Sequence, residues 1–205
     1  MRRFVLCVFA ALSLVPAGSA AAAGGNYVFA GGTPREQAQV TGALNASAFD
    51  WSLVPAQITI RIAPGLPSEA TPGTIWLDAN LLDAGMFSWG TVQHEYAHEV
   101  DFFLLDNAKR QLLETMLGGK DWCYSVLGLQ HSQYGCERFA STLAWAYWPN
   151  AANTMRPTAP TDESAAMDPA KFRALLTTLI GAPNTVLPTV TAFAPATQKK
   201  KTSHP

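Results

Sequence analysis

The segment 87–105 has the spacing of an amphipathic helix and contains no proline. His94 and His98 lie four residues apart within it, so on a helix both imidazoles leave the same face, one above the other. A fold of this chain must therefore pack the apolar side of one long helix, and on that helix both rings can point at a single ion. The apolar residues that recur at three- and four-residue steps are Trp89, Val92, Tyr96, Val100 and Phe103.

The motif His94-Glu95-x-x-His98 places a carboxylate beside two metal-ligating side chains. The imidazoles predict two ligands of a Zn²⁺ ion, and Glu95 is placed to deprotonate a metal-bound water as the general base. The alternative is an accidental spacing of two histidines. With four histidines and seven glutamates in the chain, chance would produce this motif on the order of a few times per thousand such sequences. Other zinc hydrolases and some inactive proteins also contain the motif, so it does not name the reaction.

A catalytic zinc usually has three protein ligands, so a further donor must come from elsewhere in the chain. The metzincin pattern is excluded, because Asp101 and Leu104 stand where it requires a glycine and a histidine. Asp101 lies nearly one turn beyond His98 on the predicted helix. We expect Asp101 to hold a ligand histidine or a neighbouring loop, with direct ligation as the weaker alternative.

Glu137 is the predicted third ligand, because it opens an apolar helix, 137–148, that can pack beside the motif helix. The alternative role for Glu137 is to favour a helix N-terminus through the helix dipole. His131, in the polar loop before it, is an alternative ligand or a hydrogen-bond donor to the transition state.

The remaining patterns predict an α+β fold that is mainly helical, with a small sheet before the motif helix. Thr33-Pro34-Arg35-Glu36 has the form of a capping box that starts a helix. The segment 57–63 alternates strictly between isoleucine and polar residues, as a half-buried strand does. The predicted helices are 34–46, 87–105, 106–117, 137–148 and 169–180, the predicted strands are 57–63 and 74–78, and the segments 64–73 and 120–135 are expected to be irregular.

The two ends of the chain are predicted to lie outside a single folded domain, 24–182. Residues 1–23 combine a basic start, an apolar run and small residues, as in a secretory signal peptide. The alternative is a membrane anchor, but the apolar run is short for a span. The tail 183–205 is expected to be disordered and basic. We therefore expect a secreted, extracellular protein with no stable membrane insertion after signal cleavage.

The charge of this domain argues against one class of partner, and its two cysteines predict a disulfide. Five of the 14 basic residues lie at the two ends, so residues 24–198 hold 9 basic and 15 acidic groups, which argues against nucleic acid. In an oxidising compartment Cys123 and Cys136 are expected to form a disulfide, with two buried thiols as the alternative. The sequence gives no indication of the oligomeric state.

The motif followed by Glu137-x-x-Ala140 resembles the gluzincin metallopeptidases, and His98-Glu99-Val100-Asp101 with Ser132-Gln133-Tyr134-Gly135 resembles the catalytic domain of anthrax-lethal-factor-like peptidases. The resemblance covers about residues 86–148. It implies a zincin-like fold, zinc ligands at His94, His98 and Glu137, a base at Glu95, and Tyr134 as a donor to the oxyanion, although Tyr134 stands closer to Glu137 than in the family.

The function expected from these features is hydrolysis of peptide bonds in a peptide or protein substrate by a zinc-activated water. The strand 74–78 would offer its edge to an extended substrate. Two alternatives stay open. One is a secreted zinc-binding or interaction protein without turnover, and the other is a zinc amidase that acts on cell-wall peptides.

Overall fold

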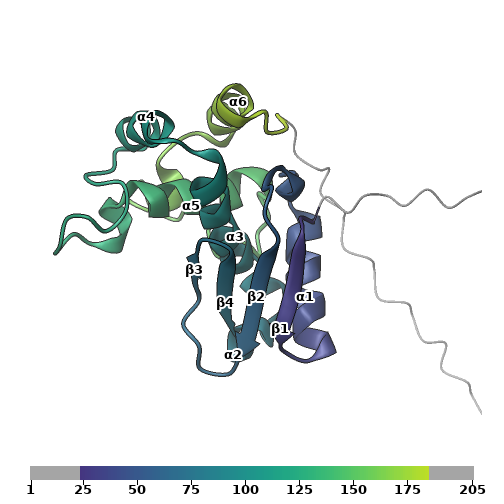
Figure 1. The fold of residues 1–205 in the computed structure, drawn as a ribbon. Helices are drawn as coiled ribbons and strands as arrows, with labels where there is room; N and C mark the ends of the chain where they lie inside the picture. The colour runs from purple at the N-terminus through teal and green to yellow at the C-terminus, as the bar shows by residue number, and fades with distance from the viewer. Residues whose placement is uncertain (1–23, 185–205) are drawn as a thin grey trace, which may run out of the picture.

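The computed structural model describes residues 24–184 as a four-stranded sheet with helices packed on one of its faces (Figure 1). The predicted signal peptide, 1–23, and nearly all of the predicted tail, 183–205, lie outside the described residues. No helix in the described part combines the length and the apolar character needed to span a bilayer.

The sheet has the strand order β1-β2-β4-β3. Its first three strands in this order are parallel, and β3 runs antiparallel to β4 at the edge. The alternation predicted for 57–63 is confirmed, because the three isoleucines of β2 are buried while Arg61 is exposed. The strands are β1 (Tyr27–Gly31), β2 (Ile58–Ala63), β3 (Glu69–Thr71) and β4 (Thr74–Asp78).

Within residues 24–184, six α-helices complete the fold, and the long helices predicted from the sequence are all present within a residue or two. Helix α1 begins with the predicted capping box, in which Thr33 and Glu36 each bond to the other's backbone N–H. Gly118 and Gly181 end α4 and α6 in the left-handed conformation, as glycine does at many helix ends. The helices are α1 (Pro34–Ala46), α2 (Ala79–Leu82), α3 (Trp89–Leu104), α4 (Asn107–Leu117), α5 (Gly135–Tyr147) and α6 (Pro169–Ile180).

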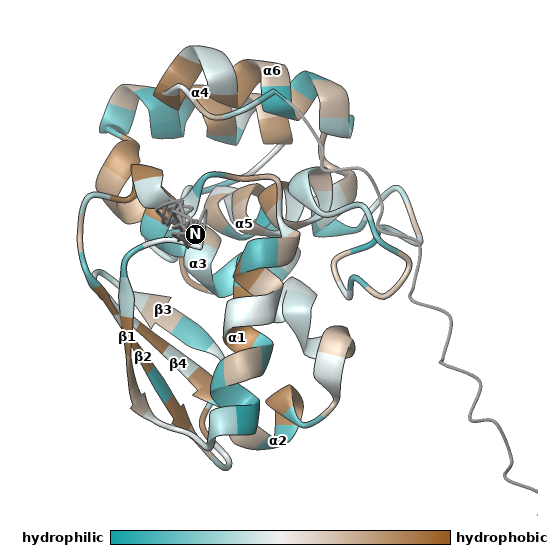
Figure 2. Ribbon diagram, turned by 90° about the vertical axis from the view of Figure 1, so that its right-hand side faces the viewer, coloured by the Kyte–Doolittle hydropathy of each residue, from teal (hydrophilic) through white to brown (hydrophobic). Residues whose placement is uncertain are grey.

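Helix α3 lies at the centre of the molecule, between the sheet and α5. It packs against α1 on one side and α5 on the other, and α4 and α6 cover α5 on the side away from the sheet (Figures 1 and 2). One continuous core joins the isoleucine face of β2 to the apolar sides of α1, α3 and α5. Tyr96, inside the histidine motif, belongs to this core and is fully buried. The core therefore fixes the rotation of α3, which turns its histidines toward α5.

The sheet has two strands that the sequence did not predict. No element was predicted for residues 27–31, which form β1, and the expectation that 64–73 is irregular is wrong, because this segment contains β3. As a result β4 lies between β2 and β3 and both of its edges are paired, so the segment 74–78 cannot accept an added strand. The edge strand beside β4 is β3, which has no strand on its outer side within residues 24–184, and β1 is the edge strand at the other side of the sheet.

The segment between α4 and α5 is mostly irregular, as predicted, but it is held firmly against the start of α5. Cys123 and Cys136 form the expected disulfide. A bridge that closes a loop of this size stabilises the folded state by about 3 kcal/mol. The side chain of Asp121 accepts hydrogen bonds from the backbone N–H groups of Ser125 and Val126, at 2.8 and 3.2 Å. The loop is therefore a rigid wall beside the first turn of α5.

Candidate metal centre

Three donor atoms from two helices meet at one point, where α3 faces the first turn of α5. His94 Nε2 lies 3.1 Å from Glu137 Oε2, His98 Nε2 lies 3.3 Å from the same oxygen, and the two nitrogens are 3.2 Å apart. All three side chains are buried, with at most 7 % of each residue exposed. The structure thus brings together the three residues that the sequence predicted as ligands.

The spacing of these donors fits a small divalent cation. Zinc binds imidazole nitrogen and carboxylate oxygen at about 2.0–2.1 Å with tetrahedral geometry, which sets neighbouring donors about 3.3 Å apart. The three observed separations, 3.1, 3.2 and 3.3 Å, match the edges of that tetrahedron. The sulfur of Cys136 lies close to His98 and Glu137, but the disulfide removes it from the set of thiolate donors. Nitrogen and oxygen donors therefore define the site.

Glu95 lies in the same cluster, farther from the motif nitrogens than Glu137 does. One of its carboxylate oxygens lies within 4.8 Å of donor nitrogens of both motif histidines. Its pKa is governed by burial and by charges, with no hydrogen bond to the rest of the described residues. Burial is the largest influence and raises the pKa of Glu95, and the two motif imidazoles offset this only in part. Glu95 is therefore a strengthened base with its oxygens free to receive a proton.

The electrostatics of Glu137 are those of a permanent anion. Burial by itself would raise its pKa, but hydrogen bonds from three surrounding imidazoles outweigh burial and hold the pKa far below its usual range. Two of these imidazoles belong to the motif, and the third is that of His131. Glu137 therefore presents a full negative charge, the state in which a carboxylate binds a metal ion.

His131 reaches the site from the loop before α5 and links two carboxylates. Its Nε2 lies 3.1 Å from Glu137 Oε2, and its Nδ1 lies 2.6 Å from Glu163 Oε1. Hydrogen bonds to these carboxylates raise the pKa of His131 to about 10. Its side chain is 57 % exposed, unlike those of the motif histidines. His131 thus stands at the opening of the site as a charged hydrogen-bond donor.

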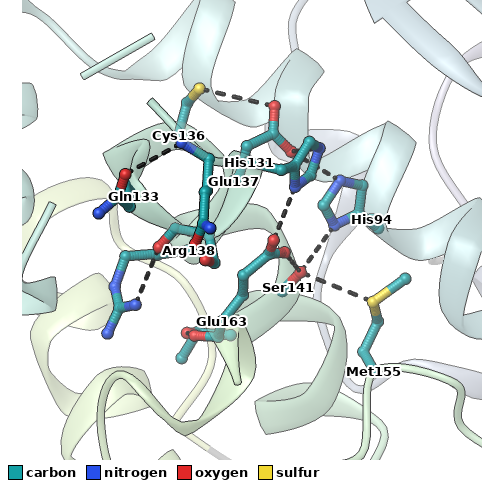
Figure 3. Close-up of polar contacts among 12 residues, drawn as sticks. His94, His131, Gln133, Cys136, Glu137, Arg138, Ser141, Met155 and Glu163 are labelled. Carbon is teal, nitrogen blue, oxygen red and sulfur yellow. Dashed lines mark hydrogen bonds and ion pairs between the residues drawn. The ribbon is translucent and has the colours of Figure 1, made fainter. Parts of the chain in front are cut away.

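Two residues that sequence reasoning missed complete the polar cluster. Ser141, one turn after Glu137 on α5, places its hydroxyl 3.1 Å from His94 Nδ1 and 2.8 Å from Glu163 Oε2 (Figure 3). The four-residue step from Glu137 could have indicated Ser141, because that step keeps a residue on the same helix face. Nothing in the sequence pattern indicated Glu163, which follows Ser141 by 22 residues in a segment without a regular period.

The tyrosine that reaches the site is Tyr124, whereas Tyr134 was the tyrosine expected from the resemblance. The hydroxyl of Tyr134 donates to the backbone carbonyl of Val126 at 2.8 Å, and its ring is buried against that of Tyr124. The hydroxyl of Tyr124 donates to Glu137 Oε1 at 2.8 Å. Tyr124 also has φ 57°, a left-handed conformation that costs a residue other than glycine about 1–2 kcal/mol. In this conformation its hydroxyl reaches Glu137 and its ring packs on that of Tyr134.

Asp101 faces away from the donor atoms and joins three segments of the chain. Its carboxylate accepts a hydrogen bond from Arg110 Nε at 2.7 Å and another from Trp122 Nε1 at 3.0 Å. Burial raises the pKa of Asp101, and the Arg110 guanidinium lowers it in part. Asp101 therefore fixes α4 and the disulfide loop on the end of α3.

The donor atoms lie at a cavity of about 380 Å³, which a strand lines on one side and a loop on the other. One wall is β3 with the residue before it, from Ser68 to Ala70, and the other is the disulfide loop with Tyr124. Glu95 and His131 also line the cavity.

Glu99 ties this edge of the sheet to the motif helix. It is fully buried, and its Oε2 accepts a hydrogen bond from the N–H of Gly73 in the β3–β4 turn at 2.9 Å. Its other carboxylate oxygen has no hydrogen-bond partner among the described residues. Burial raises the pKa of Glu99 from 4.5 to about 7, and the Gly73 N–H offsets only part of this rise.

Glu99→Gln is expected to remove part of the loss of stability that accompanies a rise in pH from 5 to 8. Because the pKa of Glu99 is higher in the folded chain, the folded state binds a proton that the unfolded chain releases between pH 4.5 and 7. Stability therefore falls as pH rises through this window, on the order of 2 kcal/mol. In thermal unfolding with a chelator present, the wild type should lose several degrees more between pH 5 and pH 8 than the variant. Equal losses would contradict this account.

The site thus gathers His94, Glu95 and His98 from α3 and Glu137 from α5, with His131 at its opening. Tyr134 and Asp101 are not among the residues that line its cavity. Compared with protein-family models, with curated proteins and with solved structures, the chain shows no match.

Proposed function

We propose that the protein is a secreted, zinc-dependent peptidase of the gluzincin type with a zincin-like fold. The observation that carries this proposal is the donor triangle of His94, His98 and Glu137, with edges of 3.1–3.3 Å and a free carboxylate beside it. A purely structural cluster would not need that carboxylate to be buried and left without a hydrogen bond. The disulfide is compatible with an extracellular location.

Each polar group around the cavity has a step in peptide hydrolysis. Zinc, when bound, would polarise the substrate carbonyl and acidify a water molecule. Glu95 accepts the proton of that water and later delivers it to the leaving amine. His131 and Tyr124 line the cavity from the side of the disulfide loop, where their N–H and O–H can donate to the developing oxyanion. This assignment places Tyr124 in the role that the resemblance gave to Tyr134.

The free edge of β3 supports an extended polypeptide as the substrate. An edge strand offers unpaired backbone N–H and C=O groups, so a peptide can add to it as a further strand. Residues 68–70 line the same cavity as the donor atoms. A peptide bound in this way would place one of its carbonyl groups near Glu95, in keeping with cleavage inside a chain.

Metal analysis together with a cleavage assay tests the proposal. The purified protein is expected to hold about one zinc ion per chain and to cleave peptides from a mixed-sequence library. A chelator should stop this cleavage, and added Zn²⁺ should restore it. A folded protein that takes up no zinc when zinc is supplied would refute the proposal. Zinc binding without cleavage would instead indicate a binding protein, and cleavage confined to cell-wall peptides would indicate an amidase.

A further inference from the structure

The carboxylate of Glu163 lies outside the donor triangle and is connected to two histidines, to His131 directly and to His94 through Ser141. Its Oε1 lies 2.6 Å from His131 Nδ1, and its Oε2 accepts the hydroxyl of Ser141 at 2.8 Å. The same hydroxyl lies 3.1 Å from His94 Nδ1. Figure 3 shows Glu163 below both rings, with His131 between Glu163 and Glu137. One side chain from a distant segment is therefore connected both to a ligand histidine and to the histidine at the opening.

The direction of these hydrogen bonds follows from the chemistry of the groups. An ionised carboxylate can only accept, so the Ser141 hydroxyl donates its proton to Glu163. The oxygen of Ser141 is then left as an acceptor toward His94, which must donate from Nδ1–H. A neutral imidazole with its proton on Nδ1 has a lone pair on Nε2. In the metal-loaded site that lone pair would be available to zinc, whereas without a metal the same nitrogen lies 3.1 Å from Glu137 Oε2 and donates to it.

Glu163 is held in the ionised state that this chain of bonds requires. Burial raises the pKa of Glu163, but hydrogen bonds from His131 and Ser141 outweigh it and bring the pKa below its usual value. On its other oxygen Glu163 accepts a hydrogen bond from His131, which leaves His131 Nε2 directed at Glu137 and the cavity.

We propose that Glu163 is a positioning residue that sets the tautomer of His94 through Ser141 and, with its second oxygen, aims His131 at the cavity. This inference rests on the proposed function, because it concerns the zinc affinity and the turnover of the same site. The one carboxylate of Glu163 would then influence both the zinc affinity, through His94, and the orientation of His131, the proposed hydrogen-bond donor to the transition state.

A merely structural role for the Glu163 carboxylate is the competing account. The backbone around it is already anchored without that carboxylate. The carbonyl of Glu163 accepts a hydrogen bond from Thr142 Oγ1 at 3.3 Å, and Asp162 closes the preceding turn through bonds to the N–H groups of Thr158 and Ala159. The segment is therefore held against α5 without the Glu163 carboxylate, whose own hydrogen bonds go to His131 and Ser141.

The test measures zinc affinity, by competition with a chromophoric chelator, and the absorption spectrum of the Co²⁺-substituted protein. In Glu163→Gln the amide N–H can turn toward Ser141 and reverse the direction of the hydrogen bonds between residue 163, Ser141 and His94. The dissociation constant of zinc should therefore rise by about 10–100-fold. Ser141→Ala should lower the zinc affinity over the same range and shift the same Co²⁺ bands, because the Ser141 hydroxyl is bonded to the ring of the ligand His94. His131→Ala should change the affinity and the spectrum less than Ser141→Ala does, because His131 contacts the carboxylate of Glu137 and no ligand imidazole. Glu114→Gln, a substitution on α4, is the matched control.

Double variants separate the coupled role from independent effects. Adding Ser141→Ala to Glu163→Gln should lower the zinc affinity no further, because both changes break the same hydrogen-bonded connection from Glu163 through Ser141 to His94. Adding His131→Ala to Glu163→Gln should likewise lower the kcat of the zinc-saturated enzyme no further than His131→Ala alone, while KM changes little.

Several results would overturn the inference. One is wild-type zinc affinity and an unshifted Co²⁺ spectrum in Glu163→Gln, and another is additive effects in the double variants. If Glu163→Gln does not fold, unchanged zinc affinity in Ser141→Ala alone overturns it. Failure of the proposed function looks different, because the wild-type protein itself would then bind no zinc.

Discussion

Glu95→Gln is expected to lower the rate of peptide hydrolysis by about 10²–10⁴-fold while leaving the bound zinc in place. The proposed function assigns the ligand role to Glu137 and leaves Glu95, which lies within 4.8 Å of both motif nitrogens, as the base, so its loss is expected to remove no ligand. Glutamine keeps the shape of the side chain and cannot accept the proton of the attacking water. The measurement is kcat/KM on a cleaved library peptide, with the zinc content of the same sample determined in parallel.

The matched control is Glu99→Gln, four residues further along the same helix. Its carboxylate is directed at the β3–β4 turn, where it accepts the N–H of Gly73, and it does not line the cavity. Both variants remove one buried carboxylate from α3, so a general effect of lost charge would appear in both. A Glu95→Gln protein that keeps wild-type turnover would exclude Glu95 as the base, and a non-catalytic role for the motif would then be favoured.

The parts of the fold that the sequence predicted well are those determined by local chemistry. Helix α1 begins where its capping box and proline lie together, and β2 follows the strict alternation of its isoleucines. Strand β3 has only three residues, between prolines and glycines, and is a strand only because β4 pairs with it. The order of β2, β4 and β3 depends on tertiary packing, so the free edge could not be assigned from the sequence.

The same division holds at the site. The motif histidines follow from a four-residue step on one helix, and Glu137 follows from the need for a third ligand on a helix that packs beside it. The choice between Tyr124 and Tyr134 depends on how the disulfide loop folds back, with one hydroxyl turned to Glu137 and the other to a backbone carbonyl. Glu163 arrives from a segment with no regular pattern, so only the structure could place it.

Glu137→Ala is expected to abolish stable zinc binding, whereas His131→Ala should retain it. Glu137 contributes the one anionic donor of the triangle, and its oxygen lies 3.1–3.3 Å from both motif nitrogens. Without it two imidazoles remain, which is fewer than the three protein ligands usual for a catalytic zinc. The dissociation constant of zinc should therefore rise by more than the roughly 100-fold seen when an outer hydrogen-bond partner of a ligand is lost.

His131 makes this comparison decisive, because it also reaches Glu137 Oε2 at 3.1 Å and is the other residue that could serve as third ligand. Its exposed side chain and its bond to Glu163 leave its Nε2 on the cavity side of Glu137. Zinc content and chelator competition on the two variants, under identical conditions, separate the roles. If His131→Ala loses its zinc and Glu137→Ala keeps it, the third ligand is the histidine, and Glu137 is then a carboxylate that only orients the three imidazoles around it.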